Sequence, residues 1–159
     1  ITEEILETGT TLKENALQKA RYVYDKTGLS CFSDDTGLEI IALNNRPGVY
    51  SAMYAGADCN AENNMQKVLK ELSSIHNRKA KFKTVIALIL NGKEFFFEGD
   101  VSGKILQEKT GSEGFGYDPI FYYPPLKKTF AAMKNDEKNS ISHRGKALRN
   151  FSDILEKQL

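Results

Sequence analysis

Two adjacent carboxylates, Asp34 and Asp35, stand within the stretch FSDDTGLEI, with apolar residues on both sides. Like charges at this spacing repel each other, and an unpaired carboxylate is costly to bury. A divalent cation removes that cost, and Mg²⁺ prefers one or two protein carboxylates together with phosphate oxygens and water. On an extended segment the two side chains would face opposite ways, so that one could hold metal while the other activates a water. A solvated turn is the alternative, because Asp-Asp-Thr-Gly is also turn composition.

The stretch GSEGFGYDP, residues 111–119, combines glycines with two aromatic rings. Glycines permit close approach of the backbone to a ligand. Phe115 and Tyr117 can stack on a planar base, and Asp118 can accept a hydrogen bond from a base N–H. These residues indicate a nucleotide site, with an ordinary glycine-rich turn as the alternative.

Cationic side chains stand at two further places. The stretch EKNSISHRGKA contains Lys138, His143 and Arg144 close to a predicted helix start, where anions bind well. Arg144 offers a planar fork of donors, and His143 can donate to a carbonyl oxygen. Lys19 lies on a helical face that also carries apolar residues, so a lysine that merely covers the surface is the alternative there. The sequence contains no Walker-type phosphate loop and no recognisable nucleophile motif around either histidine.

The first element that must position these residues is a helix over residues 10–28. Apolar residues recur there at helical spacing. Thr10 or Thr11 can cap its start, with Glu14 completing a capping box after Thr11, and Gly28 ends it.

The other elements follow from periodicity and from turn residues. They are a strand over 29–35 that ends at the two aspartates, a strand or loop over 38–43, a turn over 44–51, a helix over 61–75, two strands around Asn91-Gly92, a loop over 109–125, and a closing helix from 140 capped by Ser140 or Ser142. Interleaved strands and helices predict an α/β or α+β domain with a mixed sheet, and Asn-Gly predicts at least one antiparallel pair.

Composition limits the class of protein. The 159 residues carry a net charge of +1 and 27% charged residues, which is typical of one globular domain and gives no argument for nucleic acid or an anionic membrane. The longest apolar run, residues 84–90, has the length of a buried strand. Cys31 and Cys59 are predicted to be free thiols in a reducing cytosol, although a disulfide stays open. The first residue is Ile1, so we expect a chain that lacks its natural start.

The motifs, taken in order, resemble the inosine triphosphate pyrophosphatase family. The resemblance runs from Glu7 to Leu148 through ETGTTLKENALQKAR, SDDTGLEI, RPGVYSAMYAG, FKTVIAL, FEGDVSGKI, GSEGFGYDPIF and EKNSISHRGKAL. GFGYDPIF together with SHRGKAL is highly specific to that family.

The resemblance implies a fold, an activity and partners. It implies one domain over residues 1–159, with an elongated mixed β-sheet flanked by helices and a substrate cleft between two lobes. The implied substrates are the noncanonical purine nucleotides ITP, dITP and XTP, cut at the α–β phosphoanhydride to the monophosphate and pyrophosphate. Mg²⁺, a homodimer and a cytoplasmic location are implied as well, with no membrane or nucleic-acid partner.

Roles for individual residues follow from the same resemblance. By motif match, Glu7, Asp34 and Asp35 would be metal-side carboxylates, and Asp35 would also be the general base for the attacking water. Thr36 would lie beside the substrate, and Lys19 and Lys138 would contact the phosphates. Around the purine, Phe115 would stack on the ring, Gly116, Tyr117 and Asp118 would shape the pocket, and His143 and Arg144 would recognise the 6-oxo group.

The sequence departs from the family pattern at three places. The family begins with a strand and a triphosphate-binding loop that this chain is expected to lack, Met53 stands where bacterial members usually have Arg, and Ala132 stands where Glu is usual. A catalytically impaired purine-nucleotide-binding fragment is therefore the alternative function. A phosphomonoesterase of the haloacid dehalogenase type is disfavoured, because that family separates its two aspartates by one residue, whereas Asp34 and Asp35 are adjacent.

Overall fold

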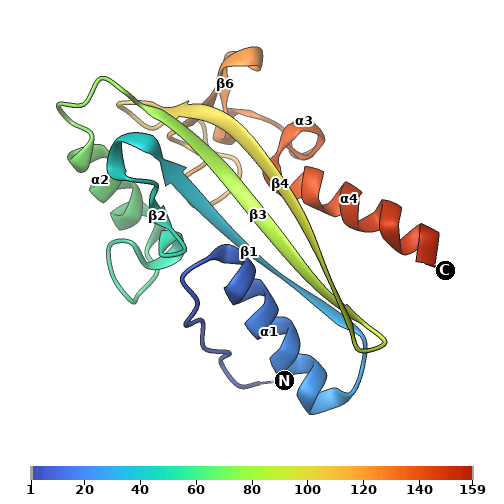
Figure 1. Cartoon of the computed structure of the whole chain (residues 1–159). Helices are drawn as coiled ribbons and strands as arrows, with labels where there is room; N and C mark the ends of the chain where they lie inside the picture. Colours follow the sequence, from blue (N-terminus) through green and yellow to red (C-terminus); the bar gives the residue numbers. More distant parts are fainter. Residues whose placement is uncertain (1, 159) are drawn as a thin grey trace.

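The computed structural model describes residues 2–158 as an antiparallel sheet with helices on both of its faces (Figure 1). The elements in chain order are α1 (Leu12–Thr27), β1 (Cys31–Ile40), β2 (Arg46–Gly48), α2 (Ala61–Glu71), β3 (Lys79–Leu90), β4 (Lys93–Ile105), β5 (Phe121–Tyr123), β6 (Lys128–Thr129), α3 (Asn135–Ile141) and α4 (His143–Gln158). Four 3₁₀ turns lie at Ile41–Leu43, Ser51–Met53, Pro124–Leu126 and Phe130–Ala132. No helix within residues 2–158 has both the length and the apolar character needed to cross a bilayer.

The six strands lie in the order β2-β1-β3-β4-β5-β6, and every pair is antiparallel. The α/β class is confirmed, but the expectation of mixed strand directions is wrong. The helix α2 does not act as a crossover, because β3 begins where β1 ends, with Ala80 opposite Ile40. No other strand within residues 2–158 pairs with the outer edge of β1 from Cys31 to Thr36, since β2 pairs only from Leu38 onward.

Local signals position α1 and the central hairpin as predicted. The Thr11 side chain accepts from the Glu14 N–H, the Glu14 side chain accepts from the Thr11 N–H, and Gly28 ends the helix in the left-handed conformation. Asn91 and Gly92 have φ values of 50° and 79°, the positive angles that a tight turn between β3 and β4 requires.

Two predicted boundaries are wrong. The strand does not end at Asp34 and Asp35 but continues through both of them to Ile40, because its backbone stays paired with β3 over the whole length. The helix predicted over 61–75 ends at Glu71. The predicted closing helix is present as α4, and its cap is Ser142, one of the two predicted serines, whose Oγ accepts from the Gly145 N–H at 3.0 Å. The short helix α3 before it was not predicted.

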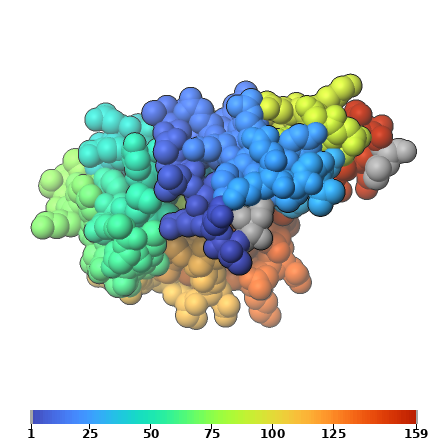
Figure 2. All heavy atoms as spheres, turned by 90° about the horizontal axis from the view of Figure 1, so that it is seen from below, coloured from blue at the N-terminus to red at the C-terminus, as the bar shows by residue number. Residues whose placement is uncertain are grey.

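The described residues contain three apolar clusters. The helices and loops around them form two lobes along the sheet (Figure 1). At one end, α1 covers one face and α4 the other. At the opposite end, α2 and the segment from β5 to α3 pack on the sheet around Leu38, Phe82 and Phe121. Seen from below, the blue surface of the N-terminal segment and α1 lies between the green region around α2 and the yellow-green hairpin tip (Figure 2). The predicted two-lobed, elongated arrangement is thus confirmed.

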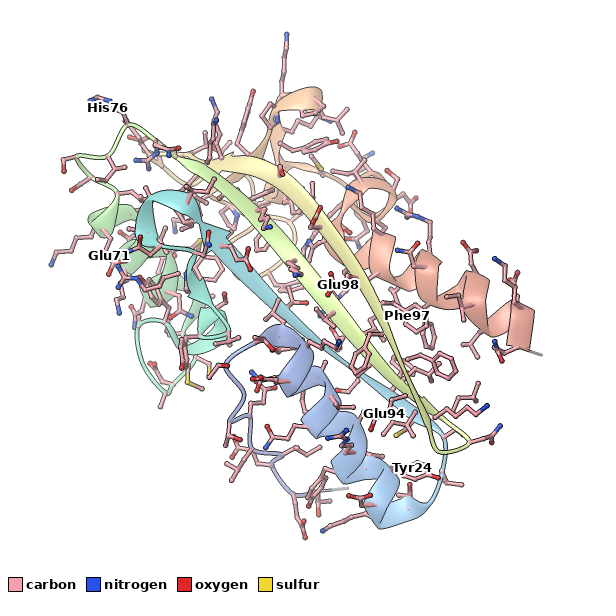
Figure 3. All side chains as sticks on the ribbon, in the orientation of Figure 1. Tyr24, Glu71, His76, Glu94, Phe97 and Glu98 are labelled. Carbon is pink, nitrogen blue, oxygen red and sulfur yellow. The ribbon has the colours of Figure 1, made fainter. Side chains whose placement is uncertain are left out.

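The start of α4 is fixed by its close approach to β4 at Gly99. A Cβ atom built on Gly99 would lie 2.1 Å from the His143 carbonyl oxygen and 2.6 Å from the Ala147 nitrogen. Both of these are backbone atoms, which cannot rotate away. Figure 3 shows Phe97, two residues earlier on β4, between the sheet and α4, where it packs against Phe151.

We therefore expect Gly99→Ala to destabilise the protein by about 2–3 kcal/mol, the upper end of the usual cost of overpacking. The free energy of unfolding in urea measures this effect. Ser102→Ala is the matched control, because Ser102 is exposed on the same strand. Equal stability of the two variants would contradict the close packing of α4 on β4.

Candidate active site

The pleat of β1 sends its two aspartates to opposite faces of the sheet. On the α1 face, the Asp35 carboxylate lies 3.4 Å from the Lys19 ammonium. On the α4 face, the Asp34 carboxylate accepts from the Arg144 guanidinium at 2.9 Å. Thr36 shares this second face, where its hydroxyl is 2.7 Å from that of Thr84. The sequence-based expectation that the two aspartates cannot do the same job on an extended strand agrees with this geometry.

A carboxylate–ammonium cluster forms on the α1 face. The Lys19 Nζ lies 2.7 Å from the Glu7 carboxylate and donates to the Asp34 carbonyl oxygen at 2.6 Å. Burial raises the pKa of the Asp35 carboxyl above its usual range, and the Glu7 charge adds to this, while Lys19 and Asn15 act in the opposite direction. The Asp35 Oδ2 atom is buried and has no hydrogen-bond partner within residues 2–158. This cluster therefore has a free carboxylate oxygen beside a second carboxylate.

The three predicted metal-side carboxylates do not meet at one point. Glu7 and Asp35 share the Lys19 ammonium, whereas Asp34 faces the other way and pairs with Arg144. Across the described chain, no group of three or more His, Cys, Asp or Glu side chains is close enough to hold a metal ion. Glu7 and Asp35 remain as the pair that could do so.

Most of the predicted substrate-binding residues line one pocket of about 300 Å³ on the α4 face. This volume is at the lower end of the range for small-molecule sites. The predicted residues in its lining are Thr36, Phe115, Gly116, Tyr117, Asp118, Lys138 and His143. Lys19 and Arg144 are not part of the lining, although Arg144 lies over the Phe115 ring at 5.7 Å. Phe115 is 65% exposed, so its ring is available for contact with a ligand in the pocket.

Asp118 organises the aromatic side of the pocket. Its Oδ2 accepts from the Phe115 N–H at 3.0 Å and from the Lys138 ammonium at 2.5 Å. Gly114 leaves the room that this carboxylate needs, because a Cβ atom there would lie 2.1 Å from Oδ2. The Lys138 Nζ in turn lies 4.6 Å from the centre of the Phe115 ring. Asp118 thus positions both the ring and the cation.

His143 forms part of the pocket floor as a neutral imidazole. It is 7% exposed and stacks on Phe82, with ring centres 4.7 Å apart. Burial lowers the pKa of His143 to about 3, and the positive charges of Arg144, Lys138 and Lys146 contribute. Its Nδ1 atom has no hydrogen-bond partner among the described residues. An unpartnered buried polar atom is unusual in a folded protein, and His143 itself lines the pocket.

Sequence reasoning missed a further part of the pocket lining, namely Phe82 of β3 and the group Ser51, Ala52, Cys59, Ala61 and Asn64. One signal was present for Asn64. This polar residue shares the buried side of α2 with Met65 and Val68, where an apolar residue is expected. The two departures from the family pattern, Met53 and Ala132, are both exposed and lie outside the pocket lining.

The fold and the site together define an α/β protein with an aromatic, cation-bearing ligand pocket beside a partly buried carboxylate pair. The chain belongs to the Ham1 family, whose model matches residues 1–154. The resemblance inferred from the motifs is confirmed at this level.

Relatives agree in sequence and in structure. A protein of Flavobacterium johnsoniae named dITP/XTP pyrophosphatase is 53% identical over 153 residues, which cover 96% of this chain and 80% of the relative. The structure of the Staphylococcus aureus Ham1 protein superposes with a TM-score of 0.95 at 40% identity, over 99% of this chain and 83% of that one. A HAM1 protein from Coxiella burnetii gives a TM-score of 0.94 at 44% identity, over 98% and 81% of the two chains.

The neutral state of His143 predicts a loss of stability in acid. Its pKa of about 3 in the folded state lies below the value of about 6.5 in an unfolded chain, so the unfolded chain binds the extra proton between these limits. Stability is therefore complete above about pH 6.5 and falls as the pH drops toward 3, by up to about 1.4 kcal/mol per pH unit. Urea unfolding at several pH values measures this slope.

The variant His143→Phe retains an aromatic ring against Phe82 and should show a shallower slope. His76→Gln is the control, because His76 is exposed at the far end of the sheet (Figure 3). If His143→Phe lost stability in acid as steeply as the wild type, the assignment of a buried neutral imidazole would be wrong.

Proposed function

We propose that this protein hydrolyses the noncanonical purine nucleotides ITP, dITP and XTP at the α–β phosphoanhydride, giving the nucleoside monophosphate and pyrophosphate. The observation that carries the proposal is the pocket that an exposed Phe115 ring, the Lys138 ammonium and the neutral His143 imidazole line together. A planar, electron-poor heterocycle with a polar edge fits such a site. The name of the Flavobacterium johnsoniae relative, dITP/XTP pyrophosphatase, supports the same substrate class.

Base selection rests on the polar edge of the purine. The Phe115 ring stacks on the base, while His143 and Arg144 donate to its 6-oxo group. Because His143 is neutral, one ring nitrogen carries a proton and can donate without bringing a full charge into the pocket. ATP has a 6-amino group at this place and would leave the donors unpaired, which can lower its use by orders of magnitude.

In this proposal the triphosphate extends from the base pocket toward the carboxylate pair. The pocket lining and the Asp35 carboxylate belong to opposite faces of β1, so the triphosphate would pass from one face toward the other. Thr36 lies beside it, with Lys138 on the pocket side and Lys19 on the α1 side. Lys19 and Lys138 offset negative charge on the phosphates.

Asp35 is the general base of the proposed reaction. Its raised pKa brings the carboxylate closer to the pKa that suits proton transfer at neutral pH, and its free Oδ2 can accept the proton of an attacking water. A divalent cation, Mg²⁺ in our proposal, would supply charge neutralisation and polarisation of the phosphate oxygens. Glu7 and Asp35 would hold it, and Mg²⁺ requires no more than one or two protein carboxylates. Asp34 instead orients Arg144.

Further expectations belong to the same proposal. We infer that residues 1–159 act as one domain, because α1 and α4 cover opposite faces of a single sheet. A homodimer and a cytoplasmic location follow from the family resemblance, and the two free cysteines fit a reducing compartment.

A second candidate function is purine-nucleotide binding without turnover. The observation in its favour is that Lys19 already pairs with both Glu7 and Asp35, so a metal ion would have to compete with this ammonium. Incubation with ITP, dITP, XTP or ATP in the presence of Mg²⁺, with all products resolved, separates the candidates. IMP and pyrophosphate from ITP, with ATP spared, support hydrolysis. IDP and phosphate would overturn the assigned bond, and binding without products would favour the second candidate.

We expect Asp35→Asn to lower kcat for ITP by about 10²–10⁴-fold, the usual contribution of a general base, with ITP binding retained. Asp100→Asn is the matched control, because Asp100 is an exposed aspartate of another strand, β4. Thermal unfolding checks that both variants are folded. Turnover by Asp35→Asn close to the wild-type rate would remove Asp35 from the role of base.

The metal assignment makes a separate prediction. Glu7→Gln should raise the Mg²⁺ concentration for half-maximal binding severalfold, because it removes one of two carboxylates. Asp34→Asn should leave that concentration unchanged, because Asp34 faces Arg144. Calorimetric titration of the protein with Mg²⁺ measures both. A larger shift in Asp34→Asn than in Glu7→Gln would reverse the assignment.

A further inference from the structure

The pocket has a wall with little regular structure of its own. Between β2 and α2 the chain runs through residues 49–60 with a single 3₁₀ turn, Ser51–Met53, and two residues at positive φ, Gly56 and Cys59. Segments of this kind open easily unless side chains fix them. Ser51, Ala52 and Cys59 of this segment nevertheless line the same pocket as Phe115, Gly116 and Tyr117. Something outside the segment must therefore define its position.

Asn64, in the first turns of α2, makes the contacts that do so. Its Nδ2 donates to the Ala52 carbonyl oxygen at 2.8 Å and to that of Ser51 at 3.4 Å, and its Oδ1 accepts from the Ala55 N–H at 2.7 Å. The side chain is 4% exposed. A buried amide that uses both its donor and its acceptor groups on one loop holds that loop firmly, because water cannot replace the bonds.

Ser51 joins this wall to the sheet and to the opposite wall. Its Oγ accepts from the Leu38 N–H at 2.9 Å and donates to the Gly48 carbonyl oxygen at 2.6 Å. Its own carbonyl oxygen accepts from the Tyr117 hydroxyl at 2.6 Å. Burial raises the pKa of Tyr117 above its usual range, so the hydroxyl stays protonated and remains a donor. The two walls are thus connected through one carbonyl group.

We infer that Asn64 is a positioning residue for purine recognition. It holds residues 51–55 at a fixed separation from the Phe115 loop, and the Tyr117–Ser51 hydrogen bond sets that separation from the other side. This inference rests on the proposed function and deepens it. Asn64 acts through Ser51 and Ala52, and it belongs to neither the carboxylate pair nor the donors for the 6-oxo group.

The consequence is a specific kinetic signature. A slot of fixed width keeps a planar base in full contact on both sides, and a loosened wall forfeits part of these short-range contacts. The same base contacts are present in the ground state and in the transition state, so their loss raises KM and leaves kcat unchanged. A general loss of folded protein would instead lower the apparent kcat.

The first variant is Asn64→Asp, which keeps the shape and places a carboxylate against the Ser51 and Ala52 carbonyl oxygens. We expect the Kd for ITP, measured by calorimetry, to rise about tenfold, which corresponds to losing about one good hydrogen bond. Where turnover is measured, KM should rise by a similar factor with kcat within about twofold. Asn63→Asp is the matched control, the same substitution on the exposed neighbouring residue.

The second variant is Tyr117→Phe, which removes only the hydroxyl and guards against misfolding of the first. Its Kd for ITP should rise about three- to tenfold. Tyr24→Phe removes a hydroxyl at the far end of α1 and is the control (Figure 3). Because both variants act on the Ser51 carbonyl, the double variant should weaken binding less than the product of the two single effects.

The outcomes separate this inference from the proposed function. If the wild type binds ITP and both variants, Asn64→Asp and Tyr117→Phe, bind it with the same Kd, the positioning role is overturned and the proposed function stays intact. A fall in kcat without a rise in KM would also overturn it. If the wild type bound neither ITP nor XTP, the proposed function would fall, and the inference with it.

Discussion

The alternation of side chains along β1 is the constraint on which the rest of the site depends. Ten consecutive backbone pairs with β3 fix the pleat of this strand, so adjacent residues cannot share a face. Asp35 is thereby placed against Lys19 of α1, while Asp34 is placed against Arg144 of α4 and Thr36 in the lining of the aromatic pocket. One strand thus connects a carboxylate cluster on one side with a ligand pocket on the other, and the helices complete each half.

Charges inside the molecule are balanced by protein groups before any ligand arrives. Lys138 pairs with Asp118, and Lys19 pairs with Glu7 and Asp35, in each case with little exposure of the ammonium side chain. Such groups are costly to bury alone, and removing one partner of a buried pair costs about 3–5 kcal/mol. The side chains are therefore already oriented, and binding would exchange partners instead of ordering loose groups.

Much of this could be predicted from the sequence, because some signals are local. The capping box of α1 and the Asn91-Gly92 turn depend on a few residues, and both occur as expected. The predicted strand end at Asp34-Asp35 was wrong, because pairing with β3 determines the conformation more strongly than local turn composition. Gly37 also allows β1 to continue close to β2, since a Cβ atom there would lie 2.5 Å from the Gly48 carbonyl oxygen. The position of residues 51–55 depends on hydrogen bonds from Asn64 of α2, and no short sequence pattern encodes such contacts between a helix and a loop.

The close approach of α4 to β4 has a consequence for the shape of the pocket. The backbone of His143 lies against Gly99, where a Cβ atom would be 2.1 Å from its carbonyl oxygen, and the His143 side chain lines the pocket. A displacement of α4 from the sheet would therefore also displace a residue of the pocket. The packing of one helix and the geometry of ligand recognition are thus coupled through the first turn of α4.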